Sequence, residues 1–559
     1  MGNLRQDRIQ LEIADEIADQ FAKGIKIVVA AMPTGSGKSG VSWFVHQKAQ
    51  LSAAVLSHQK ILQDQYQELL FDGDVQKFIT LKGRDNYPCK IRTKTTAAFA
   101  PCAFTDKFKC HKKSDCPYIK TKKTAEVTSF LNTNYQLIWN MLDHQPEFTF
   151  RKQLYIYDEA HNIHQLYTDY RSPRITNVDL KLYEKQWNFA RDHDIKSLEY
   201  PAQNLLNAIK SIDFKRKDDD DYLFEKIAEI YELKDINAEA IGSYMKRNLD
   251  DLIETGYIYT VGAIDKIECK SRMAYNIVKQ QRQDFEDCIV ELHQQEDKKF
   301  SLTMTAFDIG TLFGKEAELY SDYKLFMSAT ILGGEKFLKN LGLDKEPHHI
   351  MDLPSRFPVE NRKIYLLPGI GINYNVINKE PAKLESTLEM TKQLILGKAE
   401  KGESGIVFTS SYDLTRIVTN YLQIHLPEEK VQLLFNMSTI ERTDILEAFK
   451  LKGDVPKVLV SCSFFEGVNL NADISRYSII FKVPYRSLGS KYVKAVMERN
   501  HELYSIWAMT DIIQACGRSV RSEDDWAESY IFDGNARRLF KNGKKFLPKW
   551  FAESLEWVS

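Results

Sequence analysis

The sequence predicts an α/β protein with two parallel-sheet domains. Apolar, β-branched runs alternate with helical patterns both in the first third of the chain and in its last 200 residues or so. A glycine-rich turn directly follows the first of these runs, and a segment with three prolines at 346–362 separates the two regions. At 559 residues, the chain has room for three or four domains of about 150 residues each.

Composition excludes some classes of protein and leaves the partner open. The chain has 76 Lys and Arg against 77 Asp and Glu, and 43% of its residues are hydrophobic, which is typical of a soluble globular protein and not of a small hormone or toxin scaffold. Eight cysteines are too few for a disulfide framework. With no secretory signal pattern at the start and no run of about 18 apolar residues, we expect a cytoplasmic protein that does not span a membrane.

The first domain is expected to begin with an amphipathic helix at 4–23, where apolar residues recur every four positions. The run IKIVVAA at 25–31 predicts a buried strand, and MPTGSGKS follows it directly. Further strands are predicted at AAVLS (53–57), QLYIYDEAH (153–161) and YKLFMSAT (323–330).

Two segments between these strands differ in character. From Cys89 to Lys123 there are ten Lys or Arg residues and two Asp, a local charge of +8 in a nearly neutral chain. The segment 166–300 is polar and helix-rich, and we interpret it as a helical insertion. After the proline-rich segment, a second α/β domain is predicted from four strand-like runs: SGIVFTS (404–410), KVQLLF (430–435), KVLVSCS (457–463) and YSIIFKV (477–483).

The turn TGSGKS at 34–39 predicts a phosphate loop. Its glycines let backbone amides approach phosphates, Lys38 reaches the β and γ phosphates, and the Ser39 hydroxyl binds magnesium. The alternative is an ordinary turn. DEAH at 158–161 argues against that, because a carboxylate at the end of a strand can meet the same metal: Asp158 would bind Mg²⁺ and Glu159 would orient or deprotonate the attacking water. Without the phosphate loop, DEAH is equally consistent with the N-terminus of a helix, where acidic residues are favourable.

A third element of this chemistry is QACGRSVRS at 514–522. Arg518 and Arg521 are three residues apart and share a helical face, from which an arginine can stabilise charge on the γ phosphate. Arginines on a helix are usually only solvated charges. The neighbouring Gln514 and Gly517 and the strand-like SYIFD downstream favour the catalytic interpretation.

In this order, TGSGKS, DEAH with Asn162, SAT at 328–330, SFFEGVNL at 463–470 and QACGRSVR resemble the helicase motifs of superfamily two. The DEAHN form and the fifth motif are similar to the XPD/DinG group of iron-sulfur helicases. The resemblance implies two RecA-like lobes that bind ATP between them, and it implies that SHQKILQDQ (57–65) and GIVFTSS (405–411) follow the DNA path. The fifth motif departs from the group at Asn469, where an Asp is usual, so a charge-dependent role there is in doubt.

The resemblance also assigns residues to the nucleotide. Gln10 stands where the group's adenine-contacting glutamine lies. The expected nucleotide-binding residues are Gln10, Thr34, Gly35, Ser36, Gly37, Lys38, Ser39, Glu466 and Gly467. The expected catalytic residues are Lys38, Asp158, Glu159, Gln514, Arg518 and Arg521, with Ser39 and Asp158 on the magnesium ion.

Four cysteines, Cys89, Cys102, Cys110 and Cys116, are separated by gaps of twelve, seven and five residues. No close pair is present, so a zinc ribbon fits poorly, while four thiolates at irregular spacing can ligate a [4Fe-4S] cluster. Zinc and unligated thiols stay open on chemistry alone. GRDNYPC before the first cysteine and CPY at 116–118 resemble the cluster domain of the XPD/DinG group. Such a metal-folded loop is expected to act as a strand-separating wedge, with its aromatics either stacking on bases or forming its small core.

These interpretations give one expected organisation and function. The expected domains are lobe one in three parts (1–86, 125–165 and 301–345), an iron-sulfur domain (87–124), a helical arch (166–300), a linker (346–362) and lobe two (363–559). The cofactors are ATP, Mg²⁺ and a [4Fe-4S] cluster, and the expected partners are single-stranded and forked duplex DNA, with a single-strand-binding or replication and repair protein as a further candidate. The resemblance implies single-stranded DNA as the track and movement from 5′ to 3′, so we expect a monomeric 5′ to 3′ DNA helicase. A translocase or RNA remodeller that does not unwind DNA, and a non-catalytic redox-sensing scaffold, are the alternatives.

Overall fold

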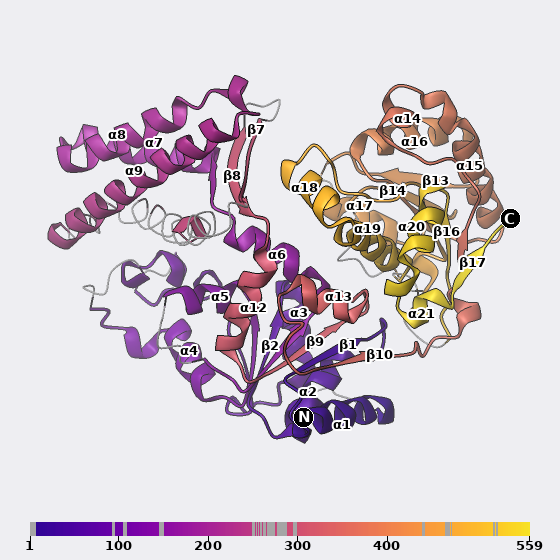
Figure 1. Ribbon diagram of the computed structural model, residues 1–559, viewed down its shortest axis with the longest axis horizontal. Helices are drawn as coiled ribbons and strands as arrows, with labels where there is room; N and C mark the ends of the chain where they lie inside the picture. Colours follow the sequence, from indigo (N-terminus) through magenta and orange to yellow (C-terminus); the bar gives the residue numbers. More distant parts are fainter. Residues whose placement is uncertain are drawn as a thin grey trace.

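The computed structural model describes most of the chain. The described residues are 7–91, 95–103, 109–144, 150–248, 288–294, 299–438, 442–463, 472–517 and 524–559, with 252, 254, 256, 257, 260, 264, 274–276, 470 and 520 between them. Figure 1 shows two lobes side by side, with a bundle of helices rising from the first lobe toward the upper left.

Lobe one is built on a seven-stranded parallel sheet with the strand order β10-β1-β9-β5-β2-β4-β3. Its strands are β1 (Ile27–Ala31), β2 (Ala53–Ser57), β3 (Phe78–Thr80), β4 (Phe130–Asn134), β5 (Leu154–Asp158), β9 (Tyr323–Ser328) and β10 (His348–Asp352). The strands predicted at 25–31, 53–57, 153–161 and 323–330 are confirmed.

Helices cover both faces of this sheet. They are α1 (Arg8–Ala22), α2 (Lys38–Ala49), α3 (Lys60–Leu70), α4 (Pro117–Val127), α5 (Tyr135–His144), α12 (Ile309–Tyr320) and α13 (Gly334–Asn340). Successive side chains of β1 point to opposite faces, so Val28 joins one hydrophobic cluster and Val29 the other. Because both faces are buried, the strand reads as a continuous apolar run in the sequence.

The arch rises from lobe one between β5 and β9. It contains α6 (Ile163–Arg171), β6 (Arg174–Thr176), α7 (Asn177–Asp192), α8 (Lys196–Lys210), α9 (Asp220–Arg247), β7 (Cys288–Gln294) and β8 (Phe300–Ala306). Helices α7, α8 and α9 form the projecting bundle in Figure 1, as predicted from the helical character of this segment. The antiparallel sheet β6-β8-β7 was not predicted; its strands join the arch to the lobe.

Lobe two is a second seven-stranded parallel sheet, in the order β13-β14-β12-β15-β16-β11-β17. Its strands are β11 (Ile364–Leu366), β12 (Gly405–Phe408), β13 (Gln432–Phe435), β14 (Lys457–Ser461), β15 (Tyr477–Ile480), β16 (Glu528–Ile531) and β17 (Leu555–Trp557). Its helices are α14 (Tyr374–Asn378), α15 (Glu385–Ala399), α16 (Tyr412–His425), α17 (Arg442–Lys450), α18 (Lys491–Arg499), α19 (His501–Cys516), α20 (Asn535–Gly543) and α21 (Lys549–Ala552).

The connection between the lobes begins later than the proline pattern indicates. Strand β10 lies within the segment 346–362, yet it pairs with β1 in the sheet of lobe one. After β10 the chain reaches Arg362, whose guanidinium donates to the carbonyl oxygen of Phe357 at 2.9 Å and pairs with Glu553 at 2.5 Å. Arg362 therefore fixes the end of the connection to the C-terminal part of lobe two.

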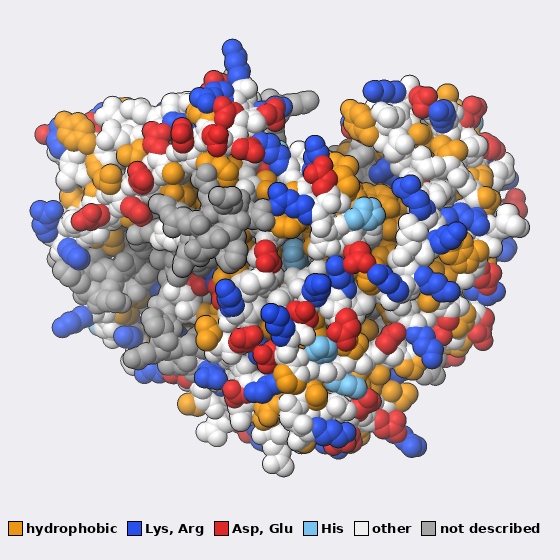
Figure 2. Space-filling model, viewed as in Figure 1, with side chains coloured by type: hydrophobic (Ala, Val, Ile, Leu, Met, Phe, Trp, Pro, Cys, Tyr) orange, Lys and Arg blue, Asp and Glu red, His pale blue; other side chains and the backbone are white. Residues whose placement is uncertain are grey.

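Lobe two also contacts the arch through α18. The Glu291 carboxylate on β7 accepts hydrogen bonds from the Lys491 backbone N–H at 2.5 Å and from the Ser490 hydroxyl at 3.2 Å. The Lys491 ammonium pairs with Asp220 of α9 at 2.6 Å. Apolar side chains of α18 and α19 pack beside this contact against Ile289 of β7. Figure 2 shows a notch in the upper outline of the molecule between the arch and lobe two.

Across the part of the chain that the structure describes, every helix is too short or too polar to cross a bilayer.

Candidate active site

The predicted phosphate loop lies at the carboxyl end of β1 and runs into α2. Gly35 and Gly37 both have positive φ angles, 79° and 74°, in the left-handed region that favours glycine. A Cβ atom on Gly35 would lie 2.4 Å from the Phe357 ring, and one on Gly37 would lie 1.8 Å from the Gln10 amide nitrogen. Both glycines are therefore required by backbone conformation and by close neighbours. The turn of the loop presents the N-terminus of α2, where backbone N–H groups can bind a phosphate anion.

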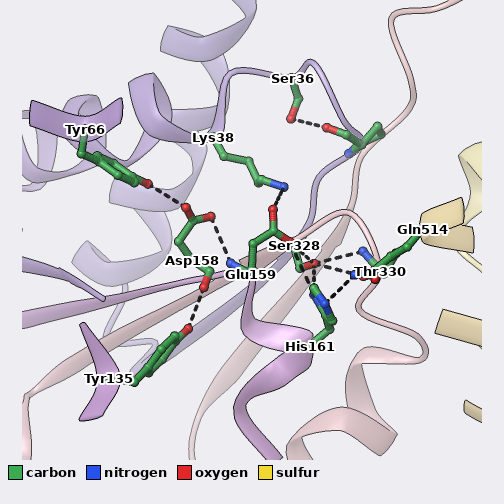
Figure 3. A network of polar contacts seen from close by, with 11 residues as sticks. Ser36, Lys38, Tyr66, Tyr135, Asp158, Glu159, His161, Ser328, Thr330 and Gln514 are labelled. Carbon is green, nitrogen blue, oxygen red and sulfur yellow. Dashed lines mark hydrogen bonds and ion pairs between the residues drawn. The ribbon is translucent and has the colours of Figure 1, made fainter. Parts of the chain in front are cut away.

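Lys38 begins α2 and points from the loop toward the end of β5 (Figure 3). Its ammonium group lies 2.7 Å from the Oε1 atom of Glu159. Glu159 itself adopts a left-handed conformation with φ of 50°, which turns the chain sharply after the strand. The structure thus brings together the two motifs that lie 121 residues apart in the sequence.

Asp158 is the last residue of β5, and its side chain is held from both oxygens. The Oδ1 atom accepts from the Glu159 backbone N–H at 3.0 Å, and the Oδ2 atom accepts from the Tyr66 hydroxyl at 3.3 Å. The Tyr135 hydroxyl donates to the Asp158 carbonyl oxygen at 2.7 Å. Figure 3 shows the two tyrosines on either side of the aspartate.

The two carboxylates have opposite electrostatic environments. Burial and the neighbouring Glu159 charge raise the pKa of Asp158. Burial also acts to raise the pKa of Glu159, but the Lys38 ammonium group outweighs it and lowers that pKa. Asp158 is thus a buried carboxylate beside little positive charge, which favours binding of a cation.

A chain of hydrogen bonds joins the two lobes at Glu159. The Gln514 amide nitrogen on α19 lies 2.5 Å from His161 Nε2, and His161 Nδ1 lies 2.7 Å from the Ser328 hydroxyl oxygen. The Ser328 hydroxyl donates to Glu159 Oε2 at 3.2 Å. Since the amide nitrogen of Gln514 can only donate, His161 accepts at Nε2 and donates from Nδ1. Glu159 is therefore linked to lobe two through a directed series of donors, drawn in Figure 3.

Other predicted residues gather around the same loop, and some lie outside the described residues. Thr34 lies near Gly517, so the end of α19 approaches the phosphate loop. Gln10, on α1, lies directly against Gly37, and its Oε1 atom is buried without a hydrogen-bond partner among the described residues. Arg518, Arg521, Glu466 and Gly467 lie outside the described residues.

The side chains of Tyr66, Tyr135 and Phe357 belong to this site but were not predicted. None lies in one of the motifs, and each meets the site only through the packing of separate elements. His161 and Ser328 stand inside the quoted motifs, but only the structure shows that they form a connection to Gln514.

The four cysteines of the basic segment approach one another. Burial raises the pKa of the Cys102 thiol, and the nearby thiols of Cys110, Cys89 and Cys116 raise it further. Among the described residues, no three metal-ligating side chains stand close enough together to hold an ion as placed. Cys102 thus lies within electrostatic reach of three other thiols, which are the donor type that an iron-sulfur cluster uses.

Two of the aromatic residues beside these cysteines pack against each other and join the large hydrophobic cluster of lobe one. The rings of Tyr87 and Tyr118 lie edge to face with centroids 5.6 Å apart, and the Arg84 guanidinium lies 4.9 Å from the Tyr118 ring centre. Tyr118 is 6% exposed, whereas Phe99 is 41% exposed. Of the described aromatics in this segment, Phe99 is thus the one most available to a ligand. Phe104 and Phe108 lie outside the described residues.

A phosphate loop facing a second parallel-sheet lobe, with hydrogen bonds between the lobes that reach a carboxylate, defines the class of two-lobed nucleotide-hydrolysing motors. Known protein families match both lobes. Residues 396–554 match the helicase C-terminal domain, and residues 3–186 match the res subunit of type III restriction enzymes.

Individual relatives extend this similarity over most of the chain. The chain is 22% identical to the ATP-dependent DNA helicase YoaA of Haemophilus influenzae over 479 residues, which are 81% of this chain and 70% of the relative. It is 21% identical to the ATP-dependent DNA helicase CHL1 of Candida albicans over 510 residues, 75% of this chain and 57% of the relative. The chain thus spans little more than half the length of the second relative.

Solved structures show the same fold. An XPD helicase matches with a TM-score of 0.60 at 16% identity, over 99% of this chain and 100% of that one. Xpd4 of S. tokodaii matches with a TM-score of 0.57 at 14% identity, over 99% and 100% of the two chains. The two sheets therefore have the RecA-like fold of the XPD structures. By sequence, the chain is similar to ATP-dependent DNA helicases, and its second lobe matches the helicase C-terminal domain.

Proposed function

We propose that this protein is an ATP-dependent DNA helicase that moves 5′ to 3′ on single-stranded DNA and separates the strands of forked duplexes. The observation that carries the proposal is the hydrogen-bonded connection from Gln514 in lobe two to Glu159 beside the phosphate loop. Through it, a change in the distance between the lobes alters the position of the carboxylate that orients water.

Different residues around the phosphate loop contact different parts of the nucleotide. The amides of Thr34–Ser39 and the N-terminus of α2 bind the phosphates, and Lys38 moves from Glu159 to the β and γ phosphates. Gln10 contacts the adenine. We also assign to the nucleotide site Arg518, Arg521, Glu466 and Gly467, which lie outside the described residues. Glu159, once released from Lys38, accepts a proton from the attacking water.

Magnesium fits this site. The Asp158 carboxylate is buried and held by two donors, and Ser39 stands at the start of α2 opposite it. These two residues would hold the ion, which supplies neutralisation of charge on the β and γ phosphate oxygens.

We assign the segment 87–124 to an iron-sulfur domain in which Cys89, Cys102, Cys110 and Cys116 hold a [4Fe-4S] cluster. The influence of the other three thiols on Cys102 supports this assignment. The cluster supplies folding free energy to the segment. Its lysines are placed to meet DNA phosphates, and the folded domain acts as the wedge at the fork. For the other domains we propose the boundaries expected from the sequence, except that β10, which falls within 346–362, belongs to lobe one.

Strand-separation and hydrolysis assays test the proposal together. Purified protein should hydrolyse ATP faster with single-stranded DNA, and it should unwind a duplex with a 5′ overhang but not one with a 3′ overhang. Lys38→Ala should remove both activities. Unwinding of RNA only, or stimulated hydrolysis without any unwinding, would point to a remodelling translocase. A wild-type protein with no stimulated hydrolysis would point to a scaffold.

A further inference from the structure

Tyr66 of α3 places a buried hydroxyl group among the residues proposed to hold magnesium. The side chain is 1% exposed, and its hydroxyl lies 3.3 Å from Asp158 Oδ2 and 3.5 Å from the Ser42 hydroxyl. The Ser39 side chain lies near the same phenol, where it acts to lower the pKa of Tyr66. One hydroxyl therefore lies between the carboxylate and the hydroxyl that would bind the ion, although α3 carries none of the nucleotide motifs.

The donor and acceptor roles at this hydroxyl follow from the chemistry. A carboxylate can only accept, so the Tyr66 O–H donates to Asp158. The Ser42 hydroxyl donates to the Ser39 carbonyl oxygen at 2.8 Å, which fixes Ser42 beside the phenol. Burial and the Asp158 charge raise the pKa of Tyr66 well above its ordinary value, so the phenol remains a donor over the whole working pH range. The second carboxylate oxygen is fixed by the Glu159 backbone N–H at 3.0 Å.

Neither hydrogen bond removes the ability of Asp158 to bind a cation. Each carboxylate oxygen has lone pairs beyond the one that accepts a hydrogen bond, so the side chain can be oriented by Tyr66 and still coordinate an ion. Partners of this kind fix the direction of a metal ligand, and their loss typically weakens metal binding about 10- to 100-fold.

We propose that Tyr66 is a positioning residue that sets the affinity of the nucleotide-bound divalent cation by orienting Asp158 and Ser39. The proposal rests on the proposed function, since it requires that this loop binds a nucleotide with its cation. Tyr66 touches neither the nucleotide nor the reacting atoms. It acts through the two ligands.

The same geometry suggests a link to the rest of the helix. Helix α3 begins at Lys60, directly after the segment 57–59, which leaves β2 at the carboxyl edge of the sheet. Tyr66, on the same helix, directly follows the segment 57–65 that is expected to lie along the DNA path, and it thereby connects this segment to the proposed magnesium ligand Asp158.

The test compares Tyr66→Phe with Tyr155→Phe as a matched control. Tyr155 lies on β5, close in sequence to Asp158, and its hydroxyl is buried without a hydrogen-bond partner among the described residues. Free Mn²⁺ is measured by electron paramagnetic resonance with a non-hydrolysable ATP analogue present. Binding of a fluorescent ADP analogue in EDTA is measured separately, and thermal unfolding confirms that each variant is folded.

Tyr66→Phe should weaken Mn²⁺ binding about tenfold and leave nucleotide binding in EDTA within about twofold, while Tyr155→Phe changes neither. Tyr66→Met, which also lacks the hydroxyl, should show the same loss and serves if the first variant does not fold. Wild-type Mn²⁺ affinity in a folded Tyr66 variant, or an equal loss of affinity in Tyr155→Phe, would overturn this inference and leave the proposed function standing. A wild-type protein that binds no nucleotide would overturn the proposed function, and this inference with it.

Discussion

The side-chain amide of Gln514 in lobe two contacts the ring of His161 in lobe one, with 2.5 Å between the two nitrogen atoms. The other ring nitrogen of His161 is bonded to Ser328, and Ser328 is bonded to Glu159. The imidazole thus joins a residue of α19 to the carboxylate beside the phosphate loop. Separation of the lobes must break this connection at its first hydrogen bond.

Gln514→Ala should therefore slow hydrolysis without weakening nucleotide binding. Loss of one neutral hydrogen bond, worth about 0.5–1.5 kcal/mol, lowers DNA-stimulated kcat by up to about tenfold and leaves KM for ATP nearly unchanged. Steady-state ATPase assays measure both constants. Gln393 is an exposed residue of α15 in the same lobe, so Gln393→Ala is the control and should have the kcat and KM of the wild type. Undiminished stimulation in Gln514→Ala would contradict the role of the connection.

Glu159→Gln and Lys38→Ala should fail at different steps. The amide of Glu159→Gln cannot take a proton from water, so turnover should fall by at least about 100-fold while the nucleotide still binds. Lys38→Ala removes the cation that meets the phosphates, so nucleotide binding itself should weaken. Equilibrium binding of a fluorescent ATP analogue and single-turnover hydrolysis distinguish the two. Normal turnover in Glu159→Gln would show that another group acts as the base.

Stability at mildly acid pH should depend on His164 of α6. Burial and the nearby Arg486 charge lower the pKa of His164 to about 4, against the partly opposing charge of Asp308. Because the unfolded chain takes up a proton near pH 6.5, the folded state is favoured above that pH and loses up to about 3 kcal/mol as the pH falls from 6.5 to 4.

His164→Phe should remove that part of the pH dependence. Thermal unfolding of both proteins at pH 7.5 and pH 5 measures it, and the wild type should lose more degrees than the variant between the two conditions. An exposed histidine variant, His193→Phe, is the control and should follow the wild type. Equal losses in wild type and His164→Phe would show that other groups carry the acid sensitivity.

Cys102→Ser should separate the activities of the cluster domain from those of the lobes. We expect loss of bound iron and acid-labile sulfide and loss of unwinding, with appreciable ATP hydrolysis retained, since the lobes do not depend on this segment for their sheets. Anaerobic purification, metal and sulfide analysis and a visible spectrum provide the measurement. Cys462→Ser, in lobe two, should keep the cluster. Unwinding by an iron-free Cys102→Ser protein would refute the wedge.

Glu291→Ala should loosen the contact between arch and lobe two. The Glu291 carboxylate accepts from the backbone at the start of α18, and its loss should cost about 1 kcal/mol of local stability. Hydrogen exchange at the first amides of α18 should then quicken by roughly fivefold to tenfold. Glu498→Ala, exposed on the same helix, should leave the exchange of these amides unchanged.

Much of the two sheets could be predicted because their central strands are buried on both faces. Strands such as β1 and β14 are short apolar runs, and this pattern is visible without any knowledge of their neighbours. Edge strands lack it: β10 reads HHIMD and β17 reads LEW, so neither stands out from a loop. Their position depends on pairing with distant strands, which a single sequence does not show.

The candidate site likewise has residues that the sequence predicts and residues that only the structure shows. Lys38, Asp158 and Glu159 lie in local motifs whose spacing alone indicates phosphate chemistry. Tyr66 lies 92 residues from Asp158, and Gln514 lies 353 residues from His161, and only the folded chain brings each pair into contact. Such contacts leave no periodic trace in the sequence, because a buried tyrosine reads as an ordinary core residue.

The place of β1 in its sheet has a consequence for synthesis on the ribosome. Both strands that flank β1 come from residues 323–352, so the row of backbone amides and carbonyls along this early strand has no partner until nearly 300 further residues have been translated. At roughly 5–20 residues per second this interval is on the order of 15–60 s. During that time the nascent chain exposes an apolar strand with two open edges, which makes it a substrate for chaperones that bind emerging polypeptides.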